Sequence, residues 1–216
     1  MASDPEVPAR GRGRPVGADA EVTRRRILDA AREVIAERGQ AGATFQLIAA
    51  RAAVSRPTLH YYFNTREHVY DILLRDAATR VHRCATDALR EENLYGQLRV
   101  FVTAIGRLSV EDGVFVRFLV AAGVDRYRRR ERSAAADALV ATVQGACRTM
   151  VVRAMGRGEV PAGTDVGAVA DMLAATFWGL GLSGGFAGAP EAVARQLVIT
   201  IRGGLLAERD GPAGGG

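Results

Sequence analysis

Two short amphipathic helices are predicted within residues 44–66, and they restrict what the rest of the chain can be. In the first, apolar side chains recur at three- and four-residue spacing over residues 45–52, and the Thr44 hydroxyl is suited to cap its N-terminus. The second is expected to begin after Ser55, another N-cap residue, with Pro57 in its first turn, where a missing N–H costs no hydrogen bond. The pattern therefore predicts two helices joined by a tight turn.

The second predicted helix has a polar and aromatic outer surface. Leu59 and Phe63 are four residues apart and are expected to face inward. The positions left for the outer faces are Arg56, Thr58, His60, Tyr61 and Tyr62. This spacing is that of a helix-turn-helix, whose second helix enters the major groove of DNA. The alternative is a short helical hairpin on the surface of an all-helical protein.

The outward residue types suit particular DNA contacts. Arg56 can pair with the O6 and N7 atoms of a guanine, and the methyl group of Thr58 can meet that of a thymine. Thr44 stands at a helix N-terminus, which favours a phosphate. We predict base contacts from Arg56, Thr58, His60 and Tyr61, phosphate contacts from Thr44, Tyr62 and Arg66, and further DNA contacts from Gln46 and Pro57.

A predicted helix from Val22 to Arg38, ended by Gly39, precedes this pair, and a long helix follows from Arg66. The whole run, TRRRILDAAREVIAERGQAGATFQLIAARAAVSRPTLHYYFNTREHVYDILL, resembles the DNA-binding domain of the tetracycline-repressor (TetR) family of bacterial regulators. The matching positions are the ILDAA run, Thr44, Ile48-Ala49, Val54-Ser55, Thr58-Leu59, Tyr62-Phe63 and Arg66-Glu67. The resemblance implies a transcriptional regulator, in most cases a repressor.

Three positions depart from the pattern usual in that family. Ala53 stands where a glycine is usual, His60 where a tyrosine is usual, and Arg66 where a lysine is usual. If the turn needs a positive φ at Ala53, the methyl group introduces strain. A histidine at position 60 can make a DNA contact sensitive to pH.

The positive charge of the chain is concentrated near its N-terminus. Residues 1–66 hold 11 Arg against 7 acidic residues, whereas residues 67–216 hold 18 against 17. A surplus of this kind is expected of a domain that binds phosphates.

The first twenty residues are rich in Pro, Gly and charge and are predicted to be disordered. Within them the run ARGRGRP, Ala9 to Pro15, resembles the Arg-Gly-Arg-Pro hooks that lie in narrow minor grooves, which predicts DNA contacts from Arg10, Arg12 and Arg14. The alternative is a basic tail that adds only salt-dependent affinity.

Downstream, apolar periodicity predicts an all-α fold with helices at 66–90, 94–108, 111–124, 132–157, 165–182 and 190–208. The predicted organisation is a basic arm (1–20), a helix-turn-helix DNA-binding domain (21–66), a helical ligand-binding and dimerisation domain (67–208) and a disordered tail (209–216).

The family resemblance also implies roles for the C-terminal helices. In TetR-like proteins the last two long helices form a four-helix dimer interface, which here would be 165–182 and 190–208. Ala175, Gly179 and Ala194 are small enough for close helix approach. The middle helices of such proteins enclose a ligand pocket. The residues predicted to contact a ligand are Phe101, Ile105, Phe115, Phe118, Phe177 and Trp178, with Arg117, Gln144 and Arg148 as polar anchors. The alternative is that the aromatic residues are ordinary core.

Several other classes of protein are disfavoured. The two cysteines, Cys84 and Cys147, are too few and too far apart for a disulfide framework or a four-ligand metal site. The uncharged stretch between Asp171 and Glu191 holds five glycines and no basic flank, which predicts a buried helix and a loop in place of a membrane span. There is no secretory signal pattern, so a cytoplasmic protein is expected.

Two short patterns resemble enzyme motifs. Residues 181–185 fit the nucleophile elbow and residues 179–184 fit the dinucleotide-binding pattern. Neither follows a predicted strand, and no histidine follows Ser183. We therefore predict no catalytic residues, no metal and no cofactor.

Together these features predict a homodimeric repressor that binds a pseudo-palindromic double-stranded operator and is released by a small-molecule effector, through movement of the 66–90 helix. Two alternatives remain. One is a regulator that answers to a protein partner or to no ligand, and the other is a weakly specific protein that coats DNA through its basic arm.

Overall fold

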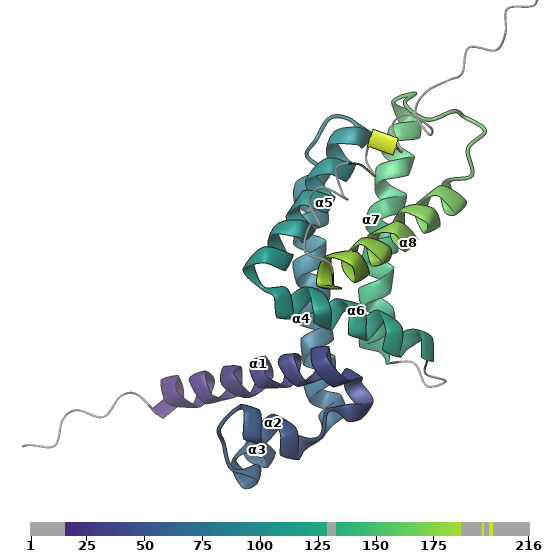
Figure 1. The fold of residues 1–216 in the computed structure, drawn as a ribbon. Helices are drawn as coiled ribbons and strands as arrows, with labels where there is room; N and C mark the ends of the chain where they lie inside the picture. The colour runs from purple at the N-terminus through teal and green to yellow at the C-terminus, as the bar shows by residue number, and fades with distance from the viewer. Residues whose placement is uncertain (1–15, 129–132, 187–195, 197–198, 201–216) are drawn as a thin grey trace, which may run out of the picture.

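The computed structural model describes residues 16–128, 133–186, 196 and 199–200 (Figure 1). Every regular element in these residues is a helix, as predicted. The helices are α1 (Val16–Gly42), α2 (Phe45–Arg51), α3 (Arg56–Tyr62), α4 (Arg66–Ala88), α5 (Leu94–Glu111), α6 (Gly113–Arg128), α7 (Ala134–Gly156) and α8 (Val166–Phe186).

The helix ends follow the sequence signals closely. The five helices predicted between residues 66 and 182 correspond to α4–α8, with ends that differ by at most four residues. α1 begins at Val16, six residues before the predicted start at Val22, so the last residues of the predicted arm are helical. The rest of the arm, with Arg10, Arg12 and Arg14, lies outside the described residues, as does most of the helix predicted at 190–208.

The predicted end of the first helix at Gly39 is a sharp break in α1. Gly39 has φ 69° and ψ 171°, and a short helical turn continues to Gly42. Glycine suits this position because a positive φ carries no steric cost without a Cβ atom. After the break, the backbone N–H of Gln40 donates to Oδ2 of Asp125 in α6 at 2.7 Å. The break therefore also forms a contact between the N-terminal helices and the rest of the protein.

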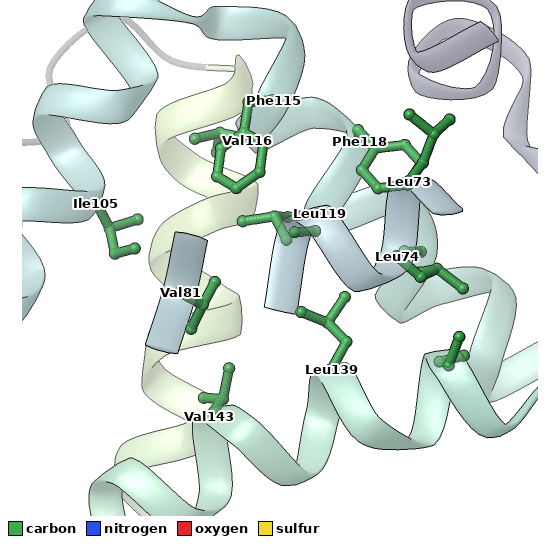
Figure 2. Packing of buried hydrophobic residues seen from close by; sticks show 14 of the residues in the cluster. Leu73, Leu74, Val81, Ile105, Phe115, Val116, Phe118, Leu119, Leu139 and Val143 are labelled. Atoms are coloured by element: carbon green, nitrogen blue, oxygen red, sulfur yellow. The ribbon is translucent and has the colours of Figure 1, made fainter. Parts of the chain in front are cut away.

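α1 lies across one end of the helical bundle formed by α4–α8, and it packs most extensively on α6 (Figure 1). α2 and α3 lie on the side of α1 that faces away from the bundle, and α4 runs from this end into the bundle. The two parts share a continuous apolar core. Figure 2 shows how α4, α5, α6 and α7 direct apolar side chains toward one another in the bundle. None of the helices described is both long enough and apolar enough to span a lipid bilayer.

Candidate nucleic-acid interface and ligand cavity

Side-chain caps begin both helices of the predicted helix-turn-helix. The Thr44 hydroxyl accepts a hydrogen bond from the backbone N–H of Leu47 at 3.3 Å, at the start of α2. The Ser55 hydroxyl accepts one from the N–H of Thr58 at 3.1 Å, at the start of α3, where Pro57 occupies the first turn. Both caps were predicted from the sequence. They satisfy backbone donors that a helix N-terminus leaves free and so define where each helix begins.

The turn between the helices is closed by a Schellman motif. The N–H of Ala53 donates to the carbonyl of Ala50 at 3.2 Å, and the N–H of Val54 donates to that of Ala49 at 3.0 Å. Ala53 has φ 50°, which makes it the one non-glycine residue with a positive φ in the described chain. The strain predicted for this departure from the family pattern is therefore present, because a Cβ atom in this conformation crowds the following carbonyl.

α3 presents its outer face to solvent. Leu59 and Phe63 are buried, as predicted from their spacing. Arg56, Pro57 and His60 are exposed, and 83% of Tyr61 is accessible. The face is free to meet a partner, because no other described element covers it.

Three residues predicted to contact DNA are partly engaged within the protein. The Thr58 hydroxyl is 2.7 Å from that of Ser55. Tyr62 is half-buried against the core, and its ring meets that of Tyr61 edge-on at 5.1 Å. His60 is exposed, but its ring lies 5.0 Å from that of Phe45. These contacts hold the outer side chains in place before any DNA arrives.

The remaining predicted DNA contacts flank α3. Thr44 and Gln46 are exposed at the start of α2. Arg66 begins α4, and its guanidinium lies 3.5 Å from the carbonyl oxygen of Ala43 and 3.7 Å from a carboxylate oxygen of Glu67. The residues predicted in the helix-turn-helix thus lie on or beside α2 and α3 and keep exposed or half-exposed side chains.

Arg51 was not singled out from the sequence, although it ties α2 to α1. Its guanidinium forms two hydrogen bonds with Glu37, at 3.0 and 2.9 Å, and a third with Glu33 at 2.9 Å. The hydrogen bond from Arg51 is the largest of the effects that lower the pKa of Glu37. Glu33 and Glu37 are four residues apart on one face of α1, and that spacing was the available signal.

A second candidate site is a cavity of about 410 Å³ between α6, α7 and α8. Its walls are Val120, Gly123, Val124, Arg126, Tyr127, Val140, Gln144, Asp171, Ala174, Ala175, Trp178 and Leu182. The volume is within the range of about 300–1,000 Å³ typical of small-molecule sites. Of the nine residues predicted to contact a ligand, two, Gln144 and Trp178, line this cavity.

The other predicted ligand residues lie elsewhere. The aromatic ones are in the core, where Phe101 stacks on Phe177 with ring centroids 5.2 Å apart and Phe118 meets Tyr70 edge-on at 6.0 Å. Phe115 and Ile105 are also buried, and the guanidinium of Arg80 lies 4.9 Å from the centre of the Phe115 ring. Arg117 and Arg148 are exposed, outside the cavity walls.

α6 connects the cavity wall to α1 at two points. Near the cavity, Asp125 accepts the hydrogen bond from Gln40 at the break in α1. At the start of α6, Asp112 forms ion pairs with Arg32 of α1 at 3.0 Å and with Arg80 of α4 at 3.3 Å. A shift of α6 would therefore be transmitted to α1 and α4, the helices on either side of the helix-turn-helix in the chain.

The potential metal ligands and thiols of the described residues form no further candidate site. No cluster of three or more potential metal ligands occurs among the described residues. Burial raises the pKa of the Cys84 thiol, and it raises that of Cys147 to about 11, so both thiols are protonated near neutral pH. A protonated, buried thiol is a poor nucleophile and metal ligand.

Comparison with known proteins agrees with the helix-turn-helix. The family described as "Bacterial regulatory proteins, tetR family" matches residues 27–71. The chain is 39% identical over 74 residues to the HTH-type transcriptional regulator SrpR of Pseudomonas putida, a match that covers 34% of this chain and 33% of SrpR. It is 26% identical over 179 residues to the HTH-type transcriptional regulator BetI of Rhizobium meliloti, covering 83% of this chain and 86% of BetI.

The match to SrpR thus spans about a third of that relative's length. The fold as a whole is similar to the crystal structure of the transcriptional regulator FadR from Bacillus subtilis in complex with stearoyl-CoA. The TM-score is 0.68 at 18% sequence identity, over 82% of this chain and 96% of FadR. The capped α2–α3 pair, the family match over it and the shared helical fold agree with one another. Residues 27–71 thus carry the N-terminal domain of the tetR family of bacterial regulatory proteins.

Proposed function

We propose that this protein is a transcriptional repressor that binds a pseudo-palindromic operator as a homodimer and is released from it by a small molecule. The observation that carries the proposal is the outer face of α3, which is capped, held on a buried Leu59 and open to solvent. Arg56 in its first turn supplies the bidentate donor for a guanine, and the exposed Tyr61 adds a second reading group. A helix N-terminus bearing such residues is how helix-turn-helix proteins read DNA.

The proposed dimer uses α8. Its exposed positions Met172, Ala175, Gly179 and Leu182 follow at three- and four-residue spacing and form one apolar face. Ala175 and Leu182 also line the cavity between α6, α7 and α8, so the dimer face and the cavity adjoin each other. A Cβ atom added to Gly179 would meet nothing within 4 Å, so packing within the chain does not require glycine there. Glycine in a helix interior costs about 0.5–1 kcal/mol relative to alanine. Close approach of a second α8 would explain why the smallest residue occupies this position.

A dimer also meets the geometric demand of the operator. Two recognition helices have to enter successive major grooves about one helical turn apart, and a two-fold protein then requires a two-fold site. A single seven-residue α3 would read too few base pairs for a specific site.

The proposed effector site is the cavity between α6, α7 and α8. α6 forms one wall of it and also holds α1 through Asp125 and Asp112. A ligand that fits the cavity better in one position of α6 would change the separation of the two DNA-binding heads, and operator affinity would fall by the ratio of its affinities for the two states. The related fold of FadR, solved with stearoyl-CoA, supports a ligand-responsive design.

The test is selection of duplexes from a random-sequence pool by the purified full-length protein at one near-physiological salt concentration. We expect a two-fold consensus with half-sites about one turn apart. Recovery of AT-rich tracts without a consensus would replace the proposal with DNA coating through the basic arm. A clear consensus that no small molecule disrupts would retain the regulator and remove the effector.

A further inference from the structure

The cavity between α6, α7 and α8 has aliphatic and aromatic walls. Val120, Val140 and Ala174 contribute aliphatic walls. Trp178 is half-buried and lies close against the backbone of α6, because a Cβ atom on Gly123 would come within 3.3 Å of the indole ring. Its other neighbour is Phe177, whose ring it meets edge-on at 5.5 Å. The indole therefore forms a fixed aromatic wall.

The polar groups of this cavity do not balance in charge. Nε of Arg126 is 2.9 Å from Oδ1 of Asp137, so the positive charge of Arg126 already has a partner. Nε2 of Gln144 donates to Oδ1 of Asp171 at 3.3 Å, which orients that carboxylate without neutralising it. Asp171 forms no ion pair with any residue in the described ranges. Among the described wall residues, Asp171 on α8 therefore carries the one charge that has no oppositely charged partner.

Two acceptor groups are left for a ligand at this position. The bond between Gln144 and Asp171 uses one carboxylate oxygen and the amide nitrogen, so Oδ2 of Asp171 and Oε1 of Gln144 retain lone pairs. A protonated amine brings two or three N–H donors and a compensating charge to such a pair. A carboxylate ligand would meet the like charge of Asp171, while the positive charge of Arg126 is already paired with Asp137.

We infer that the cavity binds an apolar, preferably aromatic, amine in its protonated form, with the ammonium group on Asp171 and Gln144 and the apolar body against Trp178. The inference rests on the proposed function, since it names the class of effector for the cavity proposed there. The amine end would lie toward α7 and α8, which carry Gln144 and Asp171, while the apolar body would reach α6, the helix that holds α1.

The sequence offers a direct probe, because Trp178 is the only tryptophan in the chain. Full-length protein is titrated with phenylbutylamine, phenylbutanol and phenylbutyrate, which share one apolar body and carry a positive charge, no charge and a negative charge. Tryptophan fluorescence reports occupancy. We expect the amine to bind about three- to fivefold more tightly than the alcohol, a modest ratio because Asp171 is exposed to solvent, and the carboxylate to bind most weakly.

Asp171→Asn should remove the preference for the amine and leave the affinity for the alcohol unchanged. Glu92→Gln removes an exposed carboxylate outside the cavity and serves as the control, with the wild-type ranking retained. If Asp171→Asn lowers the thermal unfolding midpoint, Asp137→Asn provides a second test. It removes the partner of Arg126 and should reduce the selectivity for amine over carboxylate.

The inference is overturned if the amine binds no better than the alcohol, or if selectivity is the same in wild type, Asp171→Asn and Asp137→Asn. The DNA-binding proposal and the ligand class can fail independently of each other in these experiments. Amine binding at Trp178 that does not weaken operator binding would retain the site and contradict induction. Operator binding by a protein whose Trp178 responds to none of the three probes would retain the regulator and overturn the ligand class.

Discussion

The carboxylate of Asp125 in α6 accepts a 2.7 Å hydrogen bond from the backbone N–H of Gln40, directly after the break in α1 at Gly39. The neighbouring residues Val124 and Arg126 line the cavity between α6, α7 and α8. One residue thus adjoins the cavity and holds the helix on which the DNA-binding pair is packed. The side chain also lies against Gly39, where a Cβ atom would come within 3.3 Å of Oδ1.

Asp125→Ala should weaken the docking of α1 on α6. A hydrogen bond to a charged group contributes about 1.5–3 kcal/mol, and this variant also leaves the buried Gln40 N–H without its acceptor. We expect a lower midpoint in urea unfolding. Asp125→Asn keeps an acceptor oxygen and should lose less. Equal midpoints for wild type and Asp125→Ala would show that this bond does not hold the two parts together.

Ala53→Gly should stabilise the protein. Ala53 has φ 50° at the position where a Schellman motif favours glycine. Replacing it by glycine removes the steric strain of the Cβ atom in this left-handed conformation, which should raise the free energy of unfolding by about 1 kcal/mol. Thermal unfolding measures the change. Ala50→Gly, at an exposed position of α2, is the control and should have the opposite effect. Glycine at Ala50 should destabilise by a similar amount, because its backbone is helical. A lower midpoint for Ala53→Gly would contradict this account of the turn.

Arg56→Ala should change which sequence is bound. Loss of a bidentate contact to a guanine costs about 1–3 kcal/mol and relaxes the preference at one position of each half-site. Arg66→Ala, by contrast, should weaken binding to all sequences alike, because a phosphate contact carries no sequence information. Arg90→Ala, just beyond the C-terminal end of α4, controls for the loss of charge. An unchanged consensus for Arg56→Ala would mean that α3 does not read DNA through this residue.

Arg51→Gln should loosen α2 from α1 in a manner that depends on pH. The pKa of Glu37 is lowered in the folded protein, chiefly by its hydrogen bond with Arg51. The interaction between Glu37 and Arg51 therefore stabilises the fold fully above the ordinary glutamate pKa of 4.5. That stabilisation is lost as the pH falls through the lowered pKa of Glu37. The difference in unfolding midpoint between wild type and Arg51→Gln should be largest near neutral pH and shrink in acid. Arg107→Gln, an exposed arginine of α5, should show no such trend.

Gly179→Leu should convert the proposed dimer to monomers. A side chain at Gly179 meets nothing within the protomer, so the monomer should keep its fold, while a closely packed second α8 would be displaced. Sedimentation measures the association state, and circular dichroism the fold. Gly145→Leu places the same side chain at an open position of α7 and should leave association unchanged. Dimers of undiminished stability for Gly179→Leu would move the interface away from this face.

Local chemistry was enough to predict the helices and the DNA-binding pair. The caps at Thr44 and Ser55, the inward Leu59 and Phe63 and the break at Gly39 all appear where the sequence placed them. Each depends on residues within about one helical turn of one another, and such signals can be seen in a single sequence.

The cavity was predicted less well, because periodicity identifies an apolar face without saying what that face meets. Phe101 and Trp178 looked equally suitable as ligand contacts, yet Phe101 stacks on Phe177 in the core while Trp178 lines the cavity. The polar end of the cavity joins Gln144 to Asp171, from two different helices. No local spacing relates such a pair.

The sequence by itself determined the all-helical class, the helix ends and the outward face of α3, since these follow from capping, spacing and side-chain polarity over short segments. Only the tertiary structure decided which buried rings are core and which line the cavity, and that Asp125 meets Gln40, 85 positions earlier in the chain. Those contacts depend on how whole helices pack, and packing is a property of several distant faces together.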